Sequence, residues 1–204
     1  GLYRSTNAGN SWVLIGDAEV ADATDTSFGQ DGALQAQGAD GKGGIRPFAG
    51  SSAFVWSSSY TGGVSISSDG GGTFTYANGQ APYALRNNSV NTVIQLPDLT
   101  VLAGLNPAAC TGQGGIDWSP DAGVTTWVPA VSGINPPTTT GNVRDFLRVN
   151  ANGDLLCVVQ GSGGASDGGV YLSGDSGRHW SALGTGINPS SQTLTDIVAS
   201  SSNP

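Results

Sequence analysis

A turn motif that occurs four times constrains this chain more than any other feature. Its clearest copy runs from Ser173 to Trp180, reads Ser-x-Asp-x-Gly-x-x-Trp, and follows the alternating residues 170–172. The motif's Ser recurs at positions 5, 67, 119 and 173, roughly every 50 to 60 residues. An internal repeat of this length indicates similar supersecondary units that stack on one another to bury a core.

The four copies share a Ser, an Asp or Asn two positions later, a Gly and an aromatic residue. The shared positions are Ser5, Asn7, Gly9 and Trp12; Ser67, Asp69, Gly71 and Phe74; Ser119, Asp121, Gly123 and Trp127; and Ser173, Asp175, Gly177 and Trp180. An Asp side chain can accept hydrogen bonds from N–H groups of its own turn, Gly permits positive φ, and the aromatic ring covers the turn. We therefore expect these residues to have a structural role.

Short alternating apolar runs lie between the motifs and predict strands. The expected first strands of each repeat are 44–48, 90–96, 143–149 and 194–199, and the expected second strands are 54–58, 99–103 and 155–160. No window shows sustained helical periodicity. Four short strands in a repeat of about 50 residues are typical of a β-propeller blade, so the predicted fold is all-β.

The positions of the motifs predict where the blades begin and end. We expect a half blade over 1–16, full blades over 44–78, 89–131 and 143–184, and the first strand of another blade over 194–204. About three and a half blades do not make a common closed propeller, which indicates a larger propeller or completion by another chain. The sequence has no Met, so we expect that it is processed or is a piece of a longer chain.

The repeated turn is similar to the Asp-box, or BNR repeat, of a superfamily of β-propellers. This superfamily includes sialidases, xyloglucan-active glycoside hydrolases, sortilin-type receptors and a photosystem assembly factor. The resemblance implies antiparallel four-stranded blades, but its members differ in function, so it does not identify one. A sialidase resemblance would imply an Arg triad, an Asp acid/base and a Tyr nucleophile assisted by Glu. Glu19 is the only Glu, and no catalytic residue can be assigned.

The long connections are expected on the propeller face opposite the repeated turns, where binding sites usually lie. They are 16–43, 106–114, 129–142 and 161–168. The longest contains Asp22, Asp25 and Asp31, which are candidate Ca²⁺ ligands because hard cations take carboxylate oxygens. Two alternatives stay open for these acidic residues, namely a glycosidase acid and base pair or a solvated loop. No other cofactor is expected.

Four aromatic residues outside the motifs are candidates for binding sugars by stacking: Trp56, Tyr60, Tyr83 and Trp118. The alternative is that they belong to the core between blades.

His179 lies inside the fourth motif and is expected to be an exposed turn residue. Cys110 and Cys157 are a candidate disulfide, although two cysteines say little about the compartment.

Composition excludes some classes of function and leaves several open. A net charge of -8 with 7 scattered Lys and Arg disfavours nucleic-acid binding, and no apolar stretch is long enough to span a membrane. We expect a secreted or cell-surface module for binding or assembly, not itself catalytic, whose long-loop face engages a glycan or protein. The alternatives are a fragment of a secreted xyloglucanase- or sialidase-like hydrolase, and a structural subunit of an extracellular assembly joined through its terminal strands.

Overall fold

A computed structural model shows an all-β chain, which confirms the predicted fold class. It describes residues 2–15, 45–48, 51–59, 63–67, 75–96, 98–107, 113–121, 125–130, 141–149, 154–160, 168–183, 194 and 197. These residues contain strands and no helix, and accordingly none of them forms a helix long and apolar enough to cross a membrane. All structural statements below concern these residues.

The strands form one hairpin and three four-stranded antiparallel sheets. The hairpin pairs β1 (Leu2–Arg4) with β2 (Val13–Ile15). The sheets are β3 (Ile45–Phe48), β4 (Ser51–Ser59), β5 (Gly63–Ser67) and β6 (Thr75–Tyr76); β7 (Val90–Gln95), β8 (Val101–Leu105), β9 (Gly115–Ser119) and β10 (Val128–Pro129); and β11 (Asn142–Arg148), β12 (Leu155–Gln160), β13 (Gly169–Ser173) and β14 (Ser181–Ala182). The three sheets span residues 45–76, 90–129 and 142–182.

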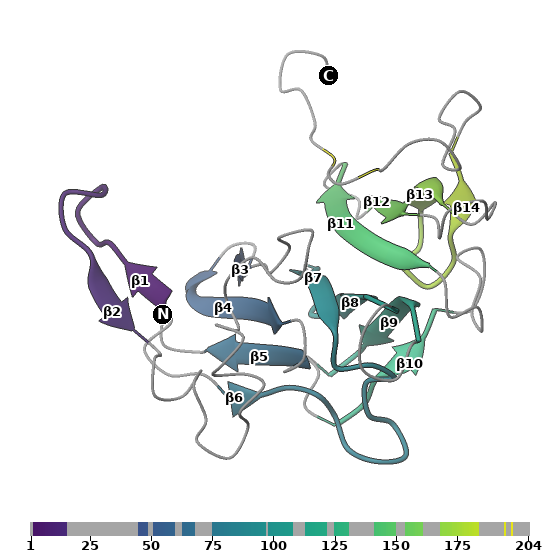
Figure 1. Cartoon of the computed structure of the whole chain (residues 1–204), viewed down its shortest axis with the longest axis horizontal. Helices are drawn as coiled ribbons and strands as arrows, with labels where there is room; N and C mark the ends of the chain where they lie inside the picture. The colour runs from purple at the N-terminus through teal and green to yellow at the C-terminus, as the bar shows by residue number, and fades with distance from the viewer. Residues whose placement is uncertain are drawn as a thin grey trace.

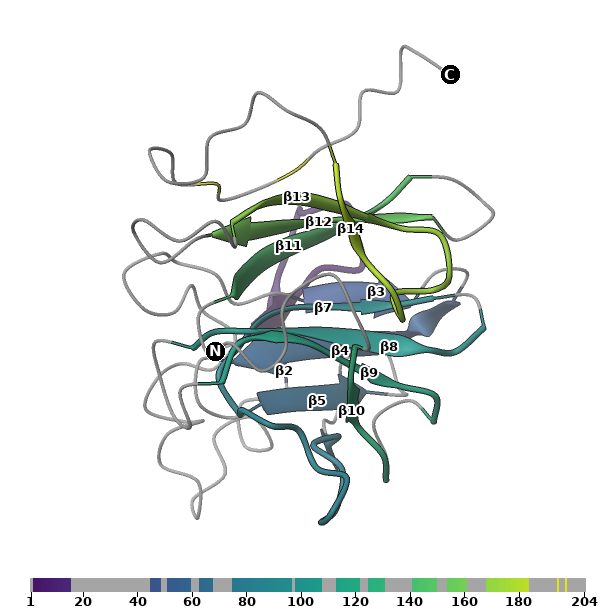
Figure 2. The same ribbon diagram turned by 90° about the vertical axis from the view of Figure 1, so that its right-hand side faces the viewer.

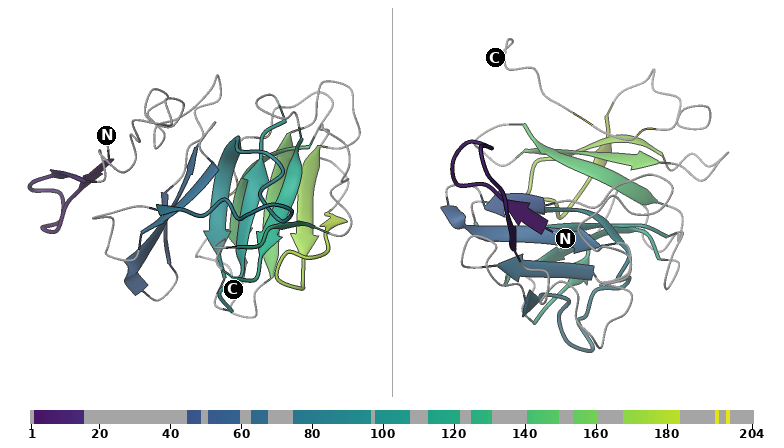
Figure 3. Two further views of the ribbon diagram at one scale, coloured as in Figure 1. Left: turned by 90° about the horizontal axis from the view of Figure 1, so that it is seen from below. Right: turned by 60° about the vertical axis from the view of Figure 1, so that its left-hand side comes forward.

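The sheets follow one another in chain order as successive blades of a partial β-propeller (Figures 1 and 2). Figure 3 shows them side by side, with the β7–β10 sheet between the other two. Strand β7, the first of its sheet, contacts β4 on one side and β11 on the other. Each sheet thus buries a face against the sheet beside it, as stacked repeats must.

Two apolar clusters form the core, one in each space between neighbouring sheets. One cluster joins Val64 of β5 to Val93 and Val101 of the middle sheet. The other joins Leu102 of β8 to residues of the last sheet that include Phe146. The middle sheet therefore has both faces covered, which explains why all of β8 is buried.

The second strand of the middle sheet begins at Val101, two residues later than the predicted 99–103. Leu99 has φ of 71° and its N–H donates to the carbonyl of Leu96 at 3.0 Å. The Asp98 carboxylate accepts from the N–H of Thr100 at 3.0 Å. These bonds extend the turn, so Leu99 is an exposed turn residue and the strand starts after it.

Strands β7 and β11 each contain an irregularity at the same place. The register of β7 with β8 shifts between Val90 and Thr92, and that of β11 with β12 shifts between Val143 and Asp145. Asn91 and Arg144 are the extra residues. A bulge redirects the side chain of the inserted residue, and both of these polar side chains are buried.

Candidate binding face

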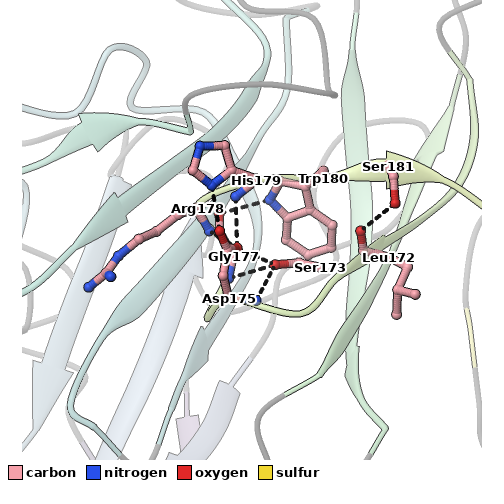
Figure 4. A network of polar contacts seen from close by, with 8 residues as sticks. All are labelled: Leu172, Ser173, Asp175, Gly177, Arg178, His179, Trp180 and Ser181. Atoms are coloured by element: carbon pink, nitrogen blue, oxygen red, sulfur yellow. Dashed lines mark hydrogen bonds and ion pairs between the residues drawn. The ribbon is translucent and has the colours of Figure 1, made fainter.

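The repeated turn is organised by a Ser and an Asp whose oxygens accept hydrogen bonds from the turn itself (Figure 4). Ser173 donates its hydroxyl to Asp175 at 3.0 Å and accepts from the N–H of Gly177 at 2.9 Å. Asp175 Oδ1 accepts from the N–H groups of Arg178 at 3.1 Å and His179 at 2.9 Å. Gly177 has φ of 82°, which is the conformation that favours glycine.

These hydrogen bonds favour the charged form of the Asp175 carboxyl group. Partial burial acts to raise the pKa of Asp175, but hydrogen bonds from the backbone and ring of His179 and from Ser173 outweigh it and lower the pKa. The His179 ring contacts the Asp175 carboxylate and is itself exposed. The carboxylate is therefore held by its own turn and is not directed toward a ligand.

The turns at Asp121 and Asn7 follow the same plan. Ser119 donates to Asp121 at 2.7 Å, and Asp121 accepts from the N–H of Thr125 at 3.2 Å. Burial acts to raise the pKa of Asp121, while hydrogen bonds from Thr125 and Ser119 lower it overall. Asn7 Oδ1 accepts from the N–H of Ser11 at 2.9 Å, so the amide replaces the carboxylate as an acceptor. Residues 69–74 of the second motif lie outside the described residues.

Residues 85–89 lie at the edge of the sheets opposite the repeated turns, where the long connections begin and end. Leu85 begins this segment, and its N–H donates to the carbonyl of Asn78 at 2.9 Å. Asn87 Nδ2 then donates to the carbonyls of Asn106 at 2.9 Å and Gln113 at 2.7 Å. These contacts attach the segment to the connection between β8 and β9 before it enters β7.

An ion pair holds this crossing segment onto the middle sheet. Arg86 Nε lies 2.6 Å from Asp117 Oδ1, and the Arg86 N–H donates to Asp117 Oδ2 at 3.0 Å. Burial raises the pKa of Asp117, and the neighbouring Arg86 offsets only part of that effect. The Asp117 side chain is fully buried, so its chemistry is confined to this pair.

A row of amide side chains lies at this same edge and joins the last two sheets. Asn91 Nδ2 donates to Asn142 Oδ1 at 2.6 Å and to the carbonyl of Val143 at 2.8 Å. Asn142 Nδ2 in turn donates to Gln160 Oε1 at 3.4 Å. We call Asn87, Asn91, Asn142 and Gln160 the amide row. Its first two members are buried, while Asn142 and Gln160 are partly exposed.

The inner strands also carry charged side chains that are buried beside this row. Arg144, the bulge residue of β11, is fully buried, and burial lowers the pKa of its guanidinium group. Thr92 donates to Asp145 Oδ1 at 3.4 Å across the space between two sheets. Polar side chains thus lie between the first strands of the two sheets, next to the apolar cluster that joins these sheets.

The described carboxylates fall into two groups, and neither is exposed at the edge with the amide row. Asp117 and Asp145 are buried. The others lie in turns at the opposite edge of the sheets: Asp98, Asp121, Asp154 and Asp175. Among the described residues, no group of three or more His, Cys, Asp and Glu is arranged to hold a metal ion. The candidate Ca²⁺ ligands Asp22, Asp25 and Asp31 lie outside the described residues.

The structure places two of the predicted ligand-binding aromatic residues. Tyr83 is 56% exposed, and its carbonyl accepts from the N–H of Trp127 at 2.6 Å, so it lies beside a repeated turn. Trp118 is partly buried against the core, and the Arg178 guanidinium lies 5.1 Å from its ring centroid. The side chain of Trp56 and all of Tyr60 lie outside the described residues. A sugar-binding role for all four stays a prediction.

Cys157 is fully buried in β12. Burial raises the pKa of its thiol well above the ordinary value. Cys110 lies outside the described residues, so the disulfide between them stays a prediction.

Sequence reasoning missed the amide row. The available signal was an Asn within one residue of the start of two successive first strands, Asn91 and Asn142, with Asn87 preceding them. Turn-rich chains contain many Asn residues, and only the pairing of strands shows which of them meet.

Comparison with known proteins shows the fold. No protein-family model and no curated protein matches the sequence. The chain is similar to the crystal structure of the GH74 enzyme of Niastella koreensis, with a TM-score of 0.58 and 18% identity over 89% of this chain and 26% of that chain. The chain thus spans about a quarter of that enzyme. A second structure, YCF48 bound to D1 peptide, matches with a TM-score of 0.28 and 14% identity over 88% of this chain and 60% of that chain.

Proposed function

We propose that this chain is a segment of an Asp-box β-propeller that acts outside the cell as a non-catalytic module for binding or assembly. Its ligand is a glycan or protein, which the long-loop face engages. The amide row is the observation that carries this proposal. The hydrogen bonds within the repeated turns support the Asp-box relationship, because the Ser donates to the Asp or Asn two positions later in all three described copies. Gly9 and Gly177 each donate their N–H to the Ser of their own copy.

The chemistry of the amide row suits a neutral polar ligand. The partly exposed members, Asn142 and Gln160, carry N–H donors and a carbonyl acceptor, which complement sugar hydroxyls and peptide groups. Asn142 is oriented by Asn91 on one side and Gln160 on the other, so little side-chain freedom is lost on binding. The exposed Gln113 extends the donors and acceptors along the same edge.

A glycan array and a peptide array probed with the purified chain test this proposal. We expect binding to one of the two ligand classes and a loss of about tenfold in affinity for Asn142→Ala, because one amide contact to a ligand is removed. Asn10→Ala is the matched control, since it removes an exposed amide from the turn between β1 and β2. Binding that is equally strong in both variants would contradict the assignment of the site.

A fragment of a secreted glycoside hydrolase is the second candidate function. The fold likeness to the GH74 enzyme favours it, and the acidic residues at 17–40 would have to supply the two carboxylates that hydrolysis requires. Incubation of the chain with xyloglucan and with sialosides, followed by analysis of released sugars, distinguishes the candidates. Sugar release would overturn the non-catalytic proposal, whereas binding without release supports it.

A further inference from the structure

The connection between β6 and β7 carries an exposed tyrosine at the rim of the stack. This connection comprises residues 77–89, and part of it projects beyond the strands (Figures 1 and 2). Tyr83 is 56% exposed. The two sheets that the connection joins already share an apolar cluster, to which Tyr83 does not belong. Its ring therefore stays at the surface of an interface that is already formed.

The backbone around Tyr83 is held in place by the third repeated turn. The N–H of Gln80 donates to the carbonyl of Thr125 at 3.2 Å, and the N–H of Trp127 donates to the carbonyl of Tyr83 at 2.6 Å. The N–H of Tyr83 donates to the carbonyl of Gln80 at 2.7 Å and closes the turn between them. A tyrosine on such a fixed backbone offers a large contact area at a low cost in conformational entropy.

Close packing on a buried tryptophan fixes this segment further. Gly79 has φ of 72°, and a Cβ there would lie 2.8 Å from Trp127 Cδ1 and 2.8 Å from the carbonyl oxygen of Tyr83. Trp127 is 2% exposed, and its Nε1 donates to the carbonyl of Ala77 at 2.8 Å. The exposed tyrosine is thus attached to a core residue on both sides of its own turn.

The side chains around Tyr83 carry no charge. Residues 75–84 and 125–130 contain no Asp, Glu, Lys, Arg or His, although the chain has a net charge of -8. Gln80 is exposed, and its amide group has N–H donors and a carbonyl acceptor. The carboxylate of Asp121, in the neighbouring turn, accepts from the N–H of Thr125 at 3.2 Å and from its hydroxyl. This combination of an aromatic ring with a neutral amide suits an uncharged ligand.

The main-chain groups at this place are already used, which disfavours a peptide as that ligand. An extended peptide that adds to a strand edge binds through main-chain hydrogen bonds. The N–H groups of Gln80, Tyr83 and Trp127 all donate to carbonyls of the chain itself. A sugar needs no such edge, because the C–H face of a pyranose stacks on an aromatic ring and its hydroxyls bond to side chains.

We propose that Tyr83 and Gln80 form a binding site for a neutral glycan at the rim beside the third repeated turn. The Tyr83 ring stacks on the apolar face of a pyranose, and the Gln80 amide bonds its hydroxyls. A β-1,4-linked glucan suits the site, because its substituents are equatorial and leave both faces of each ring apolar. The site lies away from the amide row and does not depend on the ligand proposed there.

Amide NMR of the isotope-labelled full chain, titrated with cellohexaose, tests the proposal. We expect saturable shifts in the signals of residues 79–84 and 125–127. Tyr83→Ala should raise the dissociation constant about tenfold, because the stacking surface is removed, whereas Tyr83→Phe keeps the ring and the affinity. Tyr76→Ala, which removes an exposed tyrosine on β6, is the matched control. The spectrum of each variant without ligand verifies that it is folded.

Two further probes test the class of ligand. Pentagalacturonic acid is an acidic glycan and decaproline is an uncharged peptide, and neither should shift residues 79–84 at concentrations where cellohexaose saturates the site. Cellohexaose shifts confined to the amide row would support the long-loop face and overturn this site. A chain that shows no shifts with cellohexaose, shifts that persist unchanged in Tyr83→Ala, or tighter binding of either probe would also overturn it.

Discussion

The Nδ2 group of Asn91 donates a hydrogen bond to Oδ1 of Asn142 at 2.6 Å and thereby connects the first strands of two neighbouring sheets. The same group donates to the backbone carbonyl of Val143, so one side chain holds both the side chain and the backbone of the next strand. The bulge in β7 makes this possible, because it directs a polar residue out of the regular alternation.

Replacement of Asn91 by Ala is expected to lower the free energy of unfolding by about 1–3 kcal/mol, because buried acceptors lose their donor. Urea denaturation measures this change. Asn91→Ala combined with Asn142→Ala should destabilise by less than the sum of the single variants, since the shared hydrogen bond is lost only once. Asn88→Ala, at an exposed neighbouring position, is the control. Additive effects would show that the two amides are not coupled.

The repeated turn predicts a specific pH dependence. The pKa of Asp175 is lowered in the folded chain, so its stabilising effect is fully present above the unfolded pKa of about 3.9 and is lost as the pH falls through the lower folded pKa. Asp175→Asn should therefore be less stable than the wild type at neutral pH, with a difference that shrinks in acid. Asn7 shows that an amide keeps the backbone acceptor in this turn. Urea midpoints measured across acidic pH test this, and a difference that grows in acid would contradict it.

The number and order of the sheets were predictable because the repeated turn marks each unit and strand alternation fills the space between turns. Strand limits were less predictable. Leu99 is an apolar residue next to an apolar run, which predicts a strand, yet it adopts a left-handed turn conformation. The amide row could not be predicted. It depends on bulges at Asn91 and Arg144, whose effect appears only when neighbouring sheets are in register.

Close contact between neighbouring sheets makes Gly104 sensitive to substitution. A Cβ at this position would lie 2.6 Å from Val143 Cγ1 and 2.8 Å from Thr92 Cγ2, and both neighbours have branched, stiff side chains. Gly104→Ala should destabilise the chain by about 1–3 kcal/mol through overpacking. Gly174→Ala is the matched control, since its nearest neighbour would be Asp154 Oδ1 at 3.6 Å. Thermal and urea unfolding measure both, and equal stabilities would contradict the close packing.

Burial of Cys157 predicts that its thiol is unreactive in the folded chain. Burial raises the pKa of this thiol, and the thiolate is the reactive form, so both access and ionisation oppose modification. In a Cys110→Ser variant, which isolates Cys157, a thiol reagent such as Ellman's reagent should react only after denaturant is added. The rate measured across the unfolding transition should follow the unfolded fraction. Rapid modification of the native variant would contradict the burial of Cys157, and loss of stability on Cys110→Ser would favour the predicted disulfide.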